Sequence, residues 1–266
     1  MLPLERHRLI LQLLGQSGVM RVNDIAAATG VSRETIRRDL SDLQRKGALS
    51  RSHGGALLAA NALPVTALPP PAMPAADARG SFRQRTQLNC EAKARIARRA
   101  LRLLQPGDSI LLDGSTTSWF VARQLPEMEL TVITPSVSIL QTLISRRSLR
   151  LVGLGGEFSA AEESFFGEAT ARMLQAYQVD RLFFSCQGLE RDSGLYAGSE
   201  AHASLLREMM IAARQVVALL DASKFGHPGV ARISGLGELD ILIAEPFNDP
   251  LLEKEMTWHN VEVFNA

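Results

Sequence analysis

Apolar residues recur at helical spacing in three successive segments at the start of the chain. The first helix should end at Gly15 and Gly18, because glycine is unfavourable within helices. The second follows Asn23, a good N-cap, and the third follows Ser32, which can cap it in the same way. The supporting positions are Leu4, Ile10, Leu11 and Leu14 in the first helix, residues 24–28 in the second, and Ile36, Leu40 and Leu43 along one face of the third.

Beyond residue 80 the pattern changes to short apolar runs that alternate with segments of helical spacing. Several runs are apolar throughout, as expected for strands of a sheet that is covered on both faces. The alternation predicts an α/β domain with a mainly parallel sheet. We expect strands at residues 110–112, 130–133, 149–154, 181–185, 216–220 and 241–244, and helices at 91–104, 117–125, 137–144, 168–177 and 201–214.

An alanine- and proline-rich stretch, residues 57–80, separates the two patterned regions. It holds eight Ala and five of the chain's twelve Pro, but only two charged residues. Its uncharged part is long enough to suggest a membrane span, yet the prolines argue against one, and we interpret it as a semi-rigid linker. The expected organisation is a small domain at 1–56, the linker at 57–80 and a larger domain at 81–266.

The composition is that of an ordinary globular protein, with 46% hydrophobic and 21% charged residues among 266, which excludes disorder of the whole chain. A net charge of +1 implies no bulk attraction to nucleic acid or to anionic membrane. Residues 1–56, however, carry nine Lys and Arg against five Asp and Glu, whereas residues 57–266 carry twenty against twenty-three. The basic charge therefore belongs to the small domain.

The cysteines and the N-terminus bear on where the protein works. Cys90 and Cys186 form neither a disulfide framework nor a metal-ligand spacing, and the first residues lack the order of a secretory signal. We therefore expect a cytoplasmic protein with no membrane partner, no metal and no cofactor. Cys186 could be a redox sensor, but a small buried strand residue is the favoured interpretation.

The third predicted helix carries residue types that recognise DNA. A helix, a tight glycine turn and a second helix that bears Arg beside small hydroxyl residues are typical of a helix-turn-helix, whose second helix enters the major groove. Guanidinium groups can pair with phosphate or guanine, and Ser and Thr can bond phosphate or bases. The alternative is a solvated face on which the arginines pair with acidic neighbours, but the turn and the local positive charge favour DNA. The arginines are Arg33, Arg37 and Arg38, and the acidic neighbours are Glu34, Asp39 and Asp42.

Residues 48–56 predict a strand and a glycine turn that can pair with residues 19–22, which completes a winged helix. The wing would bring Arg51 and His53 near phosphates, although a lone histidine is weak evidence because it is more often an ordinary surface residue. The predicted DNA-binding residues are Asn23, Ser32, Arg33, Thr35, Arg37, Arg38, Arg51 and His53.

The loop after the first predicted strand of the larger domain has the features of an anion site. Glycine lets the backbone approach a ligand, and successive N–H groups and hydroxyls can bind an anion at the N-terminus of the next helix. The same residue types also make an ordinary turn and N-cap, so the motif alone favours neither interpretation. The loop is DGSTT: Asp113, Gly114, Ser115, Thr116 and Thr117.

Two stretches of the small domain, SRETIRRDL at 32–40 and GALSRSHGGA at 47–56, together with Arg6, Ile10 and Leu14, resemble the winged-helix signature of the DeoR family of bacterial transcription regulators. The resemblance continues past the linker and covers most of the chain. It implies a C-terminal sensor domain related in fold to ribose 5-phosphate isomerase, which binds a phosphorylated sugar or a related metabolite. The DGSTT loop is similar to the DGGTT loop of those sensor domains, which favours the ligand interpretation of the loop.

The resemblance implies further effector contacts at the ends of predicted strands. Thr134-Pro135-Ser136 stands where the family has Thr-Asn-Ser, residues 153–156 match its glycine pair, and residues 221–225 are similar to its D-S-S-K-F stretch. Lys224 is implied as a phosphate partner, although position alone also allows an exposed loop lysine. Glu200 either recognises sugar hydroxyls or suits the helix dipole. The implied contacts are Thr134, Ser136, Gly155, Gly156, Gln187, Glu200 and Lys224.

Three positions depart from the family pattern. Gln187 stands where relatives carry an Asp that corresponds to a catalytic carboxylate of the isomerase, and glutamine cannot serve as a general base. Ser159 replaces a basic residue that is common after the glycine pair, and Pro135 removes an amide side chain. These departures leave the identity of the effector open.

The leading hypothesis is a transcriptional repressor of a carbohydrate operon. It would bind operator DNA as a dimer or tetramer, and a phosphorylated sugar in the pocket would alter that binding. An aldose-ketose phosphate isomerase fused to a DNA-binding module is disfavoured because Gln187 occupies the place of the base that proton abstraction needs; we expect no enzyme. A regulator that answers to a protein partner is the third hypothesis.

Overall fold

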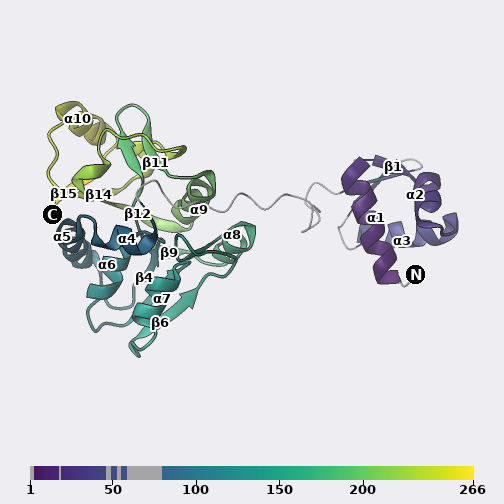
Figure 1. The fold of residues 1–266 in the computed structure, drawn as a ribbon, viewed down its shortest axis with the longest axis horizontal. Helices are drawn as coiled ribbons and strands as arrows, with labels where there is room; N and C mark the ends of the chain where they lie inside the picture. Colours follow the sequence, from purple (N-terminus) through teal and green to yellow (C-terminus); the bar gives the residue numbers. More distant parts are fainter. Residues whose placement is uncertain (1–2, 18, 46–48, 53–54, 59–79) are drawn as a thin grey trace. The chain divides into compact units, whose positions relative to one another are not determined.

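A computed structural model of the chain describes residues 3–17, 19–45, 49–52, 55–58 and 80–266. These residues form two compact units, one on each side of residues 59–79 (Figure 1).

The N-terminal unit is a winged helix-turn-helix, as predicted. Three helices accompany a three-stranded antiparallel sheet with the strand order β1-β3-β2. The predicted pairing of residues 19–22 with the glycine-turn segment is confirmed from Val19, opposite Leu57, to Arg21, opposite Gly55. The elements are α1 (Pro3–Ser17), β1 (Val19–Arg21), α2 (Val22–Thr29), α3 (Arg33–Arg45), β2 (Leu49–Ser52) and β3 (Gly55–Leu58).

The core of this unit confirms the predicted stripe of the third helix. Ile36, Leu40 and Leu43 of α3 are buried. Burying an aliphatic side chain of this size stabilises the fold by about 1.5–3 kcal/mol, so the stripe fixes which face of α3 remains outside. Its partners in the core are Ile10, Leu14, Val22, Ile25 and Leu49.

A buried carboxylate ties α3 to α1. Asp39 accepts hydrogen bonds from Arg6 Nε at 2.5 Å and Nη2 at 3.0 Å, and lies 3.1 Å from His7 Nε2. Burial acts to raise the pKa of Asp39, but the hydrogen bonds and charge of Arg6, together with His7, hold it below the usual value. Asp39 therefore joins two helices of the core and is not a partner of the exposed arginines of α3.

Several predicted helix boundaries are wrong, among them those of α1, α2 and α9. α1 continues through Gly15 to Ser17, because one glycine costs a helix only about 1 kcal/mol and the apolar face of α1 is buried. α2 begins at Val22 with Arg21 as its N-cap residue, so Asn23 lies inside the helix and does not cap it. In the C-terminal unit, α9 ends at Ile211, and residues 213–214 already belong to a strand.

The C-terminal unit is an α/β fold around a parallel sheet, as predicted. Seven strands lie in the order β15-β14-β12-β9-β4-β5-β6, and every pairing in this sheet is parallel. The strands are β4 (Ser109–Leu112), β5 (Leu130–Thr134), β6 (Leu149–Gly153), β9 (Val179–Phe184), β12 (Ala213–Leu220), β14 (Ile241–Ala244) and β15 (Glu262–Asn265).

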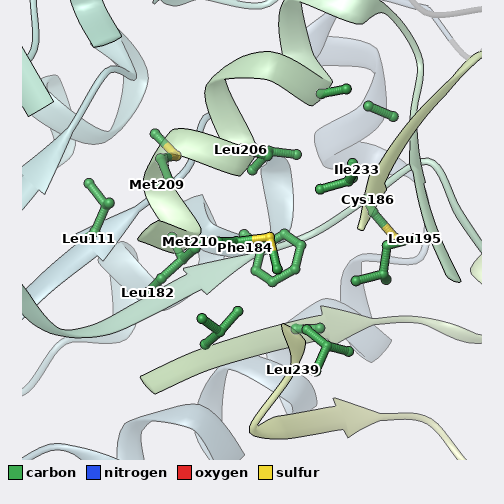
Figure 2. Close-up of a cluster of buried hydrophobic side chains, with 14 of the residues drawn as sticks. Leu111, Leu182, Phe184, Cys186, Leu195, Leu206, Met209, Met210, Ile233 and Leu239 are labelled. Carbon is green, nitrogen blue, oxygen red and sulfur yellow. The ribbon is translucent and has the colours of Figure 1, made fainter. Parts of the chain in front are cut away.

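Helices cover both faces of the sheet, and each face has its own core. One core contains residues of α5, α6 and α7, including Ile96, Phe120 and Ile139. The other contains residues of α8, α9 and α10, and Figure 2 shows part of it, where Met210 lies beside Leu182 and Phe184. The helices are α4 (Phe82–Gln87), α5 (Cys90–Ala100), α6 (Thr116–Gln124), α7 (Val137–Leu143), α8 (Glu168–Leu174), α9 (Glu200–Ile211) and α10 (Pro250–Trp258), with short 3-10 helices at Leu101–Leu103, Ala222–Lys224 and Leu236–Glu238.

Two small antiparallel sheets accompany the large one. The first is the hairpin of β7 and β8, and the second has the order β10-β11-β13. The sequence pattern did not predict either sheet, because their strands are three or four residues long and lack the continuous apolar run that identified the equally short β4 and β14. The strands are β7 (Glu157–Ser159), β8 (Ser164–Phe166), β10 (Gly188–Glu190), β11 (Gly194–Ala197) and β13 (Ala231–Ser234).

The order of the large sheet reverses between β4 and β9. From β4 the chain moves outward to β5 and β6, and it then returns to the other side of β4 to place β9, β12, β14 and β15. In open α/β sheets, ligands bind outside the carboxyl ends of the strands at such a reversal. The loops that follow β4 and β9 are therefore the expected walls of a ligand site.

Candidate functional site

The turn between α2 and α3 positions the predicted recognition helix. Gly30 ends α2 with a φ of 67°, a left-handed conformation that glycine adopts without strain. Ser32 Oγ accepts a hydrogen bond from the Thr35 backbone N–H at 3.3 Å, so Ser32 caps α3 as predicted. Both hydroxyl residues lie at the start of the helix, where its dipole favours a phosphate.

The outer face of α3 carries lightly paired arginines. The side chains of Arg37 and Arg38 are 61% and 79% exposed, and each approaches Glu34 only to 3.8 Å. Ion pairs this exposed contribute about 0–1 kcal/mol, so phosphate can replace Glu34 at little cost. Arg33 is exposed on the same helix. The face therefore has the chemistry of a DNA backbone contact, and the predicted pairing of Arg37 and Arg38 with Glu34 is present but loose.

Of the other predicted DNA contacts, the structure describes Asn23 and the backbone of Arg51. Asn23 is exposed within the first turn of α2. Arg51 lies in β2, but its side chain falls outside the described residues, and so does the whole of His53.

A cavity of about 100 Å³ lies in the C-terminal unit, beside the loops that follow β4 and β9. One water needs roughly 10–15 Å³ of such space, so the cavity has room for a molecule of several heavy atoms. The walls come from six places: the α4–α5 segment, the DGSTT loop, the tip between β7 and β8, the residues after β9, the residues around the start of α9, and the residues after β12. The polar and charged residues of the lining include Arg85, Asn89, Lys93, Asp113, Ser115, Thr116, Thr117, Glu162, Ser185, Gln187, Ser199, His202, Asp221, Ser223 and Lys224.

Asp113 organises the DGSTT loop from inside. Its Oδ1 accepts hydrogen bonds from the hydroxyls of Ser115 (2.7 Å) and Ser118 (2.5 Å), and its Oδ2 accepts one from the Ser185 backbone N–H (3.3 Å). Burial raises the pKa of Asp113, although the serine hydroxyls act to lower it. Asp113 therefore joins the ends of β4 and β9 and fixes the wall of the cavity, with both carboxylate oxygens already bonded within the protein.

The remainder of the loop forms the N-terminus of α6. Ser115 Oγ accepts a hydrogen bond from the Ser118 N–H at 3.1 Å and so caps the helix. Thr116 and Thr117 follow in its first turn and line the cavity. Gly114 is required by space, because a Cβ there would lie 2.7 Å from Ser164 Oγ. The loop is thus an N-cap and a cavity wall at once, and the two sequence interpretations are compatible.

Two lysines bring positive charge to the cavity. Lys93 of α5 is buried, and its Nζ donates hydrogen bonds to the carbonyls of Arg85 (2.7 Å) and Leu88 (2.6 Å). Lys224 lines the cavity from the 3-10 helix after β12. Ammonium groups in the wall of a cavity favour an anionic ligand.

The carboxylates around the cavity are committed to other groups. Glu162 pairs with Arg85 through two contacts, at 2.6 and 3.2 Å. Asp221 accepts hydrogen bonds from Asn89 Nδ2 and the Ser223 N–H, both at 3.0 Å. With Asp113 bonded as described, each acidic residue in the described lining has a structural partner, which is not the arrangement of a general base.

Six of the twelve predicted effector residues line this cavity, and five lie elsewhere in the unit. The twelfth, Gly114, lies in the DGSTT loop without being part of the lining. Ser136 caps α7 through the Ile139 N–H at 3.3 Å, and Thr134 Oγ1 accepts a hydrogen bond from the Ser136 N–H at 3.1 Å. Glu200, at the start of α9, pairs with Arg207, which favours the helix-dipole interpretation. The six are Asp113, Ser115, Thr116, Thr117, Gln187 and Lys224; the five outside the described lining are Thr134, Ser136, Gly155, Gly156 and Glu200.

The glycine pair Gly155-Gly156 serves packing against α8. Thr170 Oγ1 donates a hydrogen bond to the Gly155 carbonyl at 2.9 Å. A Cβ on Gly156 would lie only 2.1 Å from Thr170 Oγ1. Gly156 also has a φ of 154°, which disfavours a side chain. The backbone thus needs glycine here to let α8 approach.

The sequence analysis missed the contribution of the α4–α5 segment, which provides Arg85, Asn89 and Lys93. A lysine on the apolar side of an amphipathic helix was the available signal, since Lys93 lies beside Ala92 and precedes Ile96 and Ala97, which are also buried. The positions of Arg85 and Glu162 are 77 residues apart, and no local pattern reveals their pairing.

The described residues also bear on three further possibilities: a metal site, a membrane-spanning helix and a reactive cysteine. Among the described residues, no group of three or more His, Cys, Asp or Glu could hold a metal ion, and no helix has the length and apolar character to span a membrane. Both cysteines are free; Cys90 is exposed, and Cys186 is buried, with its Sγ 3.3 Å from the Gly188 carbonyl. The burial of Cys186 agrees with the favoured interpretation of a small buried residue.

Fold and sites together define a class of protein: a DNA-binding regulator that carries a ligand-sensing domain. A family model of the DeoR-like helix-turn-helix domain matches residues 6–61, and one of the DeoR C-terminal sensor domain matches residues 88–245. The chain belongs to the DeoR family of transcriptional regulators. This membership confirms the regulator hypothesis over the isomerase alternative.

Relatives match along nearly the whole chain. The chain is 32% identical over 256 residues to the L-fucose operon activator of Haemophilus influenzae, covering 96% of this chain and 97% of the relative. It is 30% identical over 241 residues to the transcriptional repressor GlcR of Bacillus subtilis, covering 91% and 88%. Among solved structures it is similar to ribose 5-phosphate isomerase A of Methanocaldococcus jannaschii, with a TM-score of 0.39 and 21% identity over 52% of this chain and 55% of the other.

Proposed function

We propose that this regulator represses a carbohydrate-metabolism operon and that a phosphorylated sugar or related metabolite in the sensor cavity modulates its binding to operator DNA. The observation that carries the effector half is the meeting of the α6 N-terminus with two lysines, Lys93 and Lys224, in one cavity. Helix N-termini and ammonium groups both favour a phosphate. The names of the two relatives above, an activator of one sugar operon and a repressor, support a regulatory role in carbohydrate metabolism.

The cavity provides for both parts of such a ligand. The N–H groups and hydroxyls of Ser115, Thr116 and Thr117, with Lys224, suit the phosphate. Gln187, Ser199 and Asn89, which also line the cavity, offer amide and hydroxyl groups that suit sugar hydroxyls. We propose these residues as the effector site, in place of the wider set that includes Thr134, Ser136, Gly155, Gly156 and Glu200.

The DNA half of the proposal rests on α3. Ser32, Thr35 and the exposed arginines at 33, 37 and 38 would contact the major groove and its phosphates. Arg51 and His53 of the wing, and Asn23 of α2, are further proposed contacts. Because helix-turn-helix proteins commonly bind paired half-sites, we propose a homo-oligomer, a dimer or tetramer, acting in the cytoplasm where the operator lies.

A thermal-shift screen of the full chain tests the effector half. Inorganic phosphate, ribose 5-phosphate, fructose 1-phosphate and glucose 6-phosphate are the probes. A ligand at about 100 times its Kd stabilises the unit that binds it by roughly 2.7 kcal/mol, which shifts the midpoint by a few degrees. Absence of any shift with phosphorylated sugars over a wide concentration range would remove the effector half.

The same chain tests the DNA half. A duplex selected by the full chain from a random-sequence library serves as the operator, and binding is measured with and without the stabilising probe. We expect the probe to change the Kd for the duplex by 5- to 150-fold, the usual range for allosteric coupling. A chain that enriches no sequence from the library would contradict the operator assignment.

A further inference from the structure

The first described element after residues 59–79 forms part of the wall of the sensor cavity. Gly80 and Ser81 lead into α4, and Arg85 within this helix and Leu88 and Asn89 just after it line the cavity. The polypeptide that leads from the DNA-binding unit therefore reaches the ligand site within a few residues.

α4 is held on the sensor unit by the tip of the β7–β8 hairpin. The Phe82 N–H donates a hydrogen bond to the Ala161 carbonyl at 2.9 Å. Two consecutive glutamates of the tip then pair with two arginines of α4: Glu162 with Arg85 at 2.6 Å, and Glu163 with Arg83 at 2.7 Å. The hairpin thus clamps α4 with one backbone hydrogen bond and two ion pairs.

The two ion pairs of the clamp differ in their surroundings. Arg85 and Glu162 are 13% and 2% exposed, and both line the cavity. Arg83 is 86% exposed, and neither it nor Glu163 belongs to the lining of that cavity. Only the Arg85–Glu162 pair can therefore be reached by a ligand in the cavity.

We propose that Arg85 is an effector-binding and coupling residue: an anionic ligand in the cavity takes its guanidinium from Glu162 and so releases α4 from the β7–β8 hairpin. Glu162 occupies the Nη1–Nη2 edge of the Arg85 guanidinium, and Nη1 also donates to the Gly80 carbonyl at 3.1 Å. A phosphate that binds this edge through two hydrogen bonds therefore competes with Glu162 for it. Glu162, left without that partner in a buried position, then disfavours the clamped arrangement.

This arrangement supplies the difference that allosteric coupling requires. A ligand shifts a two-state equilibrium only by its unequal affinity for the two states. Here the clamped state offers the ligand an Arg85 that is already engaged, whereas the released state offers one that is available. The ligand therefore favours release of α4, and the linkage is reciprocal: a released α4 binds the ligand more tightly.

The test is amide hydrogen exchange of residues 81–88 in the full chain, with Glu162→Gln as the key variant. In the wild type, glucose 6-phosphate or inorganic phosphate should speed exchange of this segment roughly tenfold, because the clamp opens more often. Glu162→Gln should exchange that fast without any probe, and the probe should add nothing. Glu163→Gln is the matched control: it loses the same charge from the same tip, but should remain slow without probe and respond to the probe as the wild type does.

A second variant guards against misfolding of the first. Arg85→Lys keeps the positive charge but loses the fork, so residues 81–88 should exchange faster than in the wild type and the probe should bind more weakly. The native state of each variant is checked by tryptophan fluorescence, since Trp119 and Trp258 both lie in the C-terminal unit.

The inference rests on the proposed effector function, and the results separate the two. If no probe changes the thermal midpoint of the wild type, the proposed function fails, whereas the comparison of Glu162→Gln with Glu163→Gln without probe still decides whether the inner pair holds α4. If a probe raises the midpoint but leaves exchange of residues 81–88 unchanged or slower, the inference is overturned and the proposed function stands. Equal exchange in the two glutamine variants overturns it as well.

Discussion

The recognition helix and the sensor cavity use the same residue types in opposite ways. On α3, Arg37 and Arg38 reach Glu34 only across 3.8 Å on an exposed face, whereas in the cavity Arg85 meets the buried Glu162 at 2.6 Å. Exposed pairs contribute little and can be exchanged for phosphates of DNA without disturbing the fold. When one partner of a buried pair is removed, the other charge stays buried without compensation, so the structure around it must change. The first arrangement suits binding, and the second suits the transmission of a signal.

The largest effect should come from breaking the buried pair. Arg85→Ala leaves the Glu162 carboxylate buried without its partner, and we expect the C-terminal unit to lose about 3–5 kcal/mol of unfolding free energy. Urea denaturation followed by tryptophan fluorescence measures this, because both tryptophans belong to that unit. Arg83→Ala, two residues away, should cost less than about 1 kcal/mol because its side chain is exposed. Equal losses in the two variants would remove the distinction between inner and outer pairs.

Next in size is the effect of removing a cation from the cavity. Lys224→Met should weaken binding of the phosphorylated probe by roughly 10- to 100-fold, since a hydrogen bond to a charged group contributes about 1.5–3 kcal/mol. Isothermal titration measures the change. Lys254→Met, on the exposed side of α10, removes the same charge elsewhere and should leave the affinity unchanged. A similar loss in both variants would indicate a general electrostatic effect and not a contact.

Acid should lower the unfolding free energy of the N-terminal unit by protonating Asp39. Arg6 and His7 hold the pKa of this carboxylate below the unfolded value of roughly 3.9, so its stabilisation is present above that pH and is lost as the pH falls through the folded pKa. Asp39→Asn should cost about 1–2 kcal/mol at neutral pH and flatten the stability of the unit between about pH 4 and the folded pKa. Hydrogen exchange of α3 peptides is the suitable readout, since residues 1–58 contain no aromatic side chain for fluorescence. Unchanged acid sensitivity in this variant would assign the effect to other groups.

Local patterns sufficed for the elements and for part of the site. The apolar runs of β4, β9 and β12 and the glycine turn before α3 are signals that operate within a few residues, and the structure confirms them. The DGSTT loop was found for the same reason. Its position at the point where the sheet order reverses follows from the alternation of strands and helices only once the pairing of β4 with β9 is known.

Long-range pairing explains most of what the sequence analysis missed. The β7–β8 hairpin and the β10–β11–β13 sheet have strands too short for a periodic signal. α10 did carry a local signal that was overlooked, since Asp249 caps it and Pro250 occupies its first turn. The family resemblance implied Ser136 and the glycine pair as ligand contacts. The structure shows that Ser136 caps α7 and that the glycine pair packs against α8, and their contact with an effector stays a prediction. Residue type at a strand end cannot distinguish a ligand contact from a cap.

The smallest effect on folding, and the sharpest test of the exposed surface, is Arg37→Ala. Its side chain leaves the core untouched, so stability should change by less than about 0.5 kcal/mol. If Arg37 touches a DNA phosphate, the slope of log K against log salt should fall by about 1 while sequence preference is retained. Arg150→Ala, which removes an exposed arginine of β6 in the other unit, should leave both the slope and the affinity as in the wild type. An Arg37→Ala slope that stays unchanged while preference among duplexes relaxes would place the guanidinium on a base edge. If slope, affinity and preference all match those of Arg150→Ala, then Arg37 is a solvated surface residue, and the contrast between exposed and buried arginines would hold for stability but not for DNA binding.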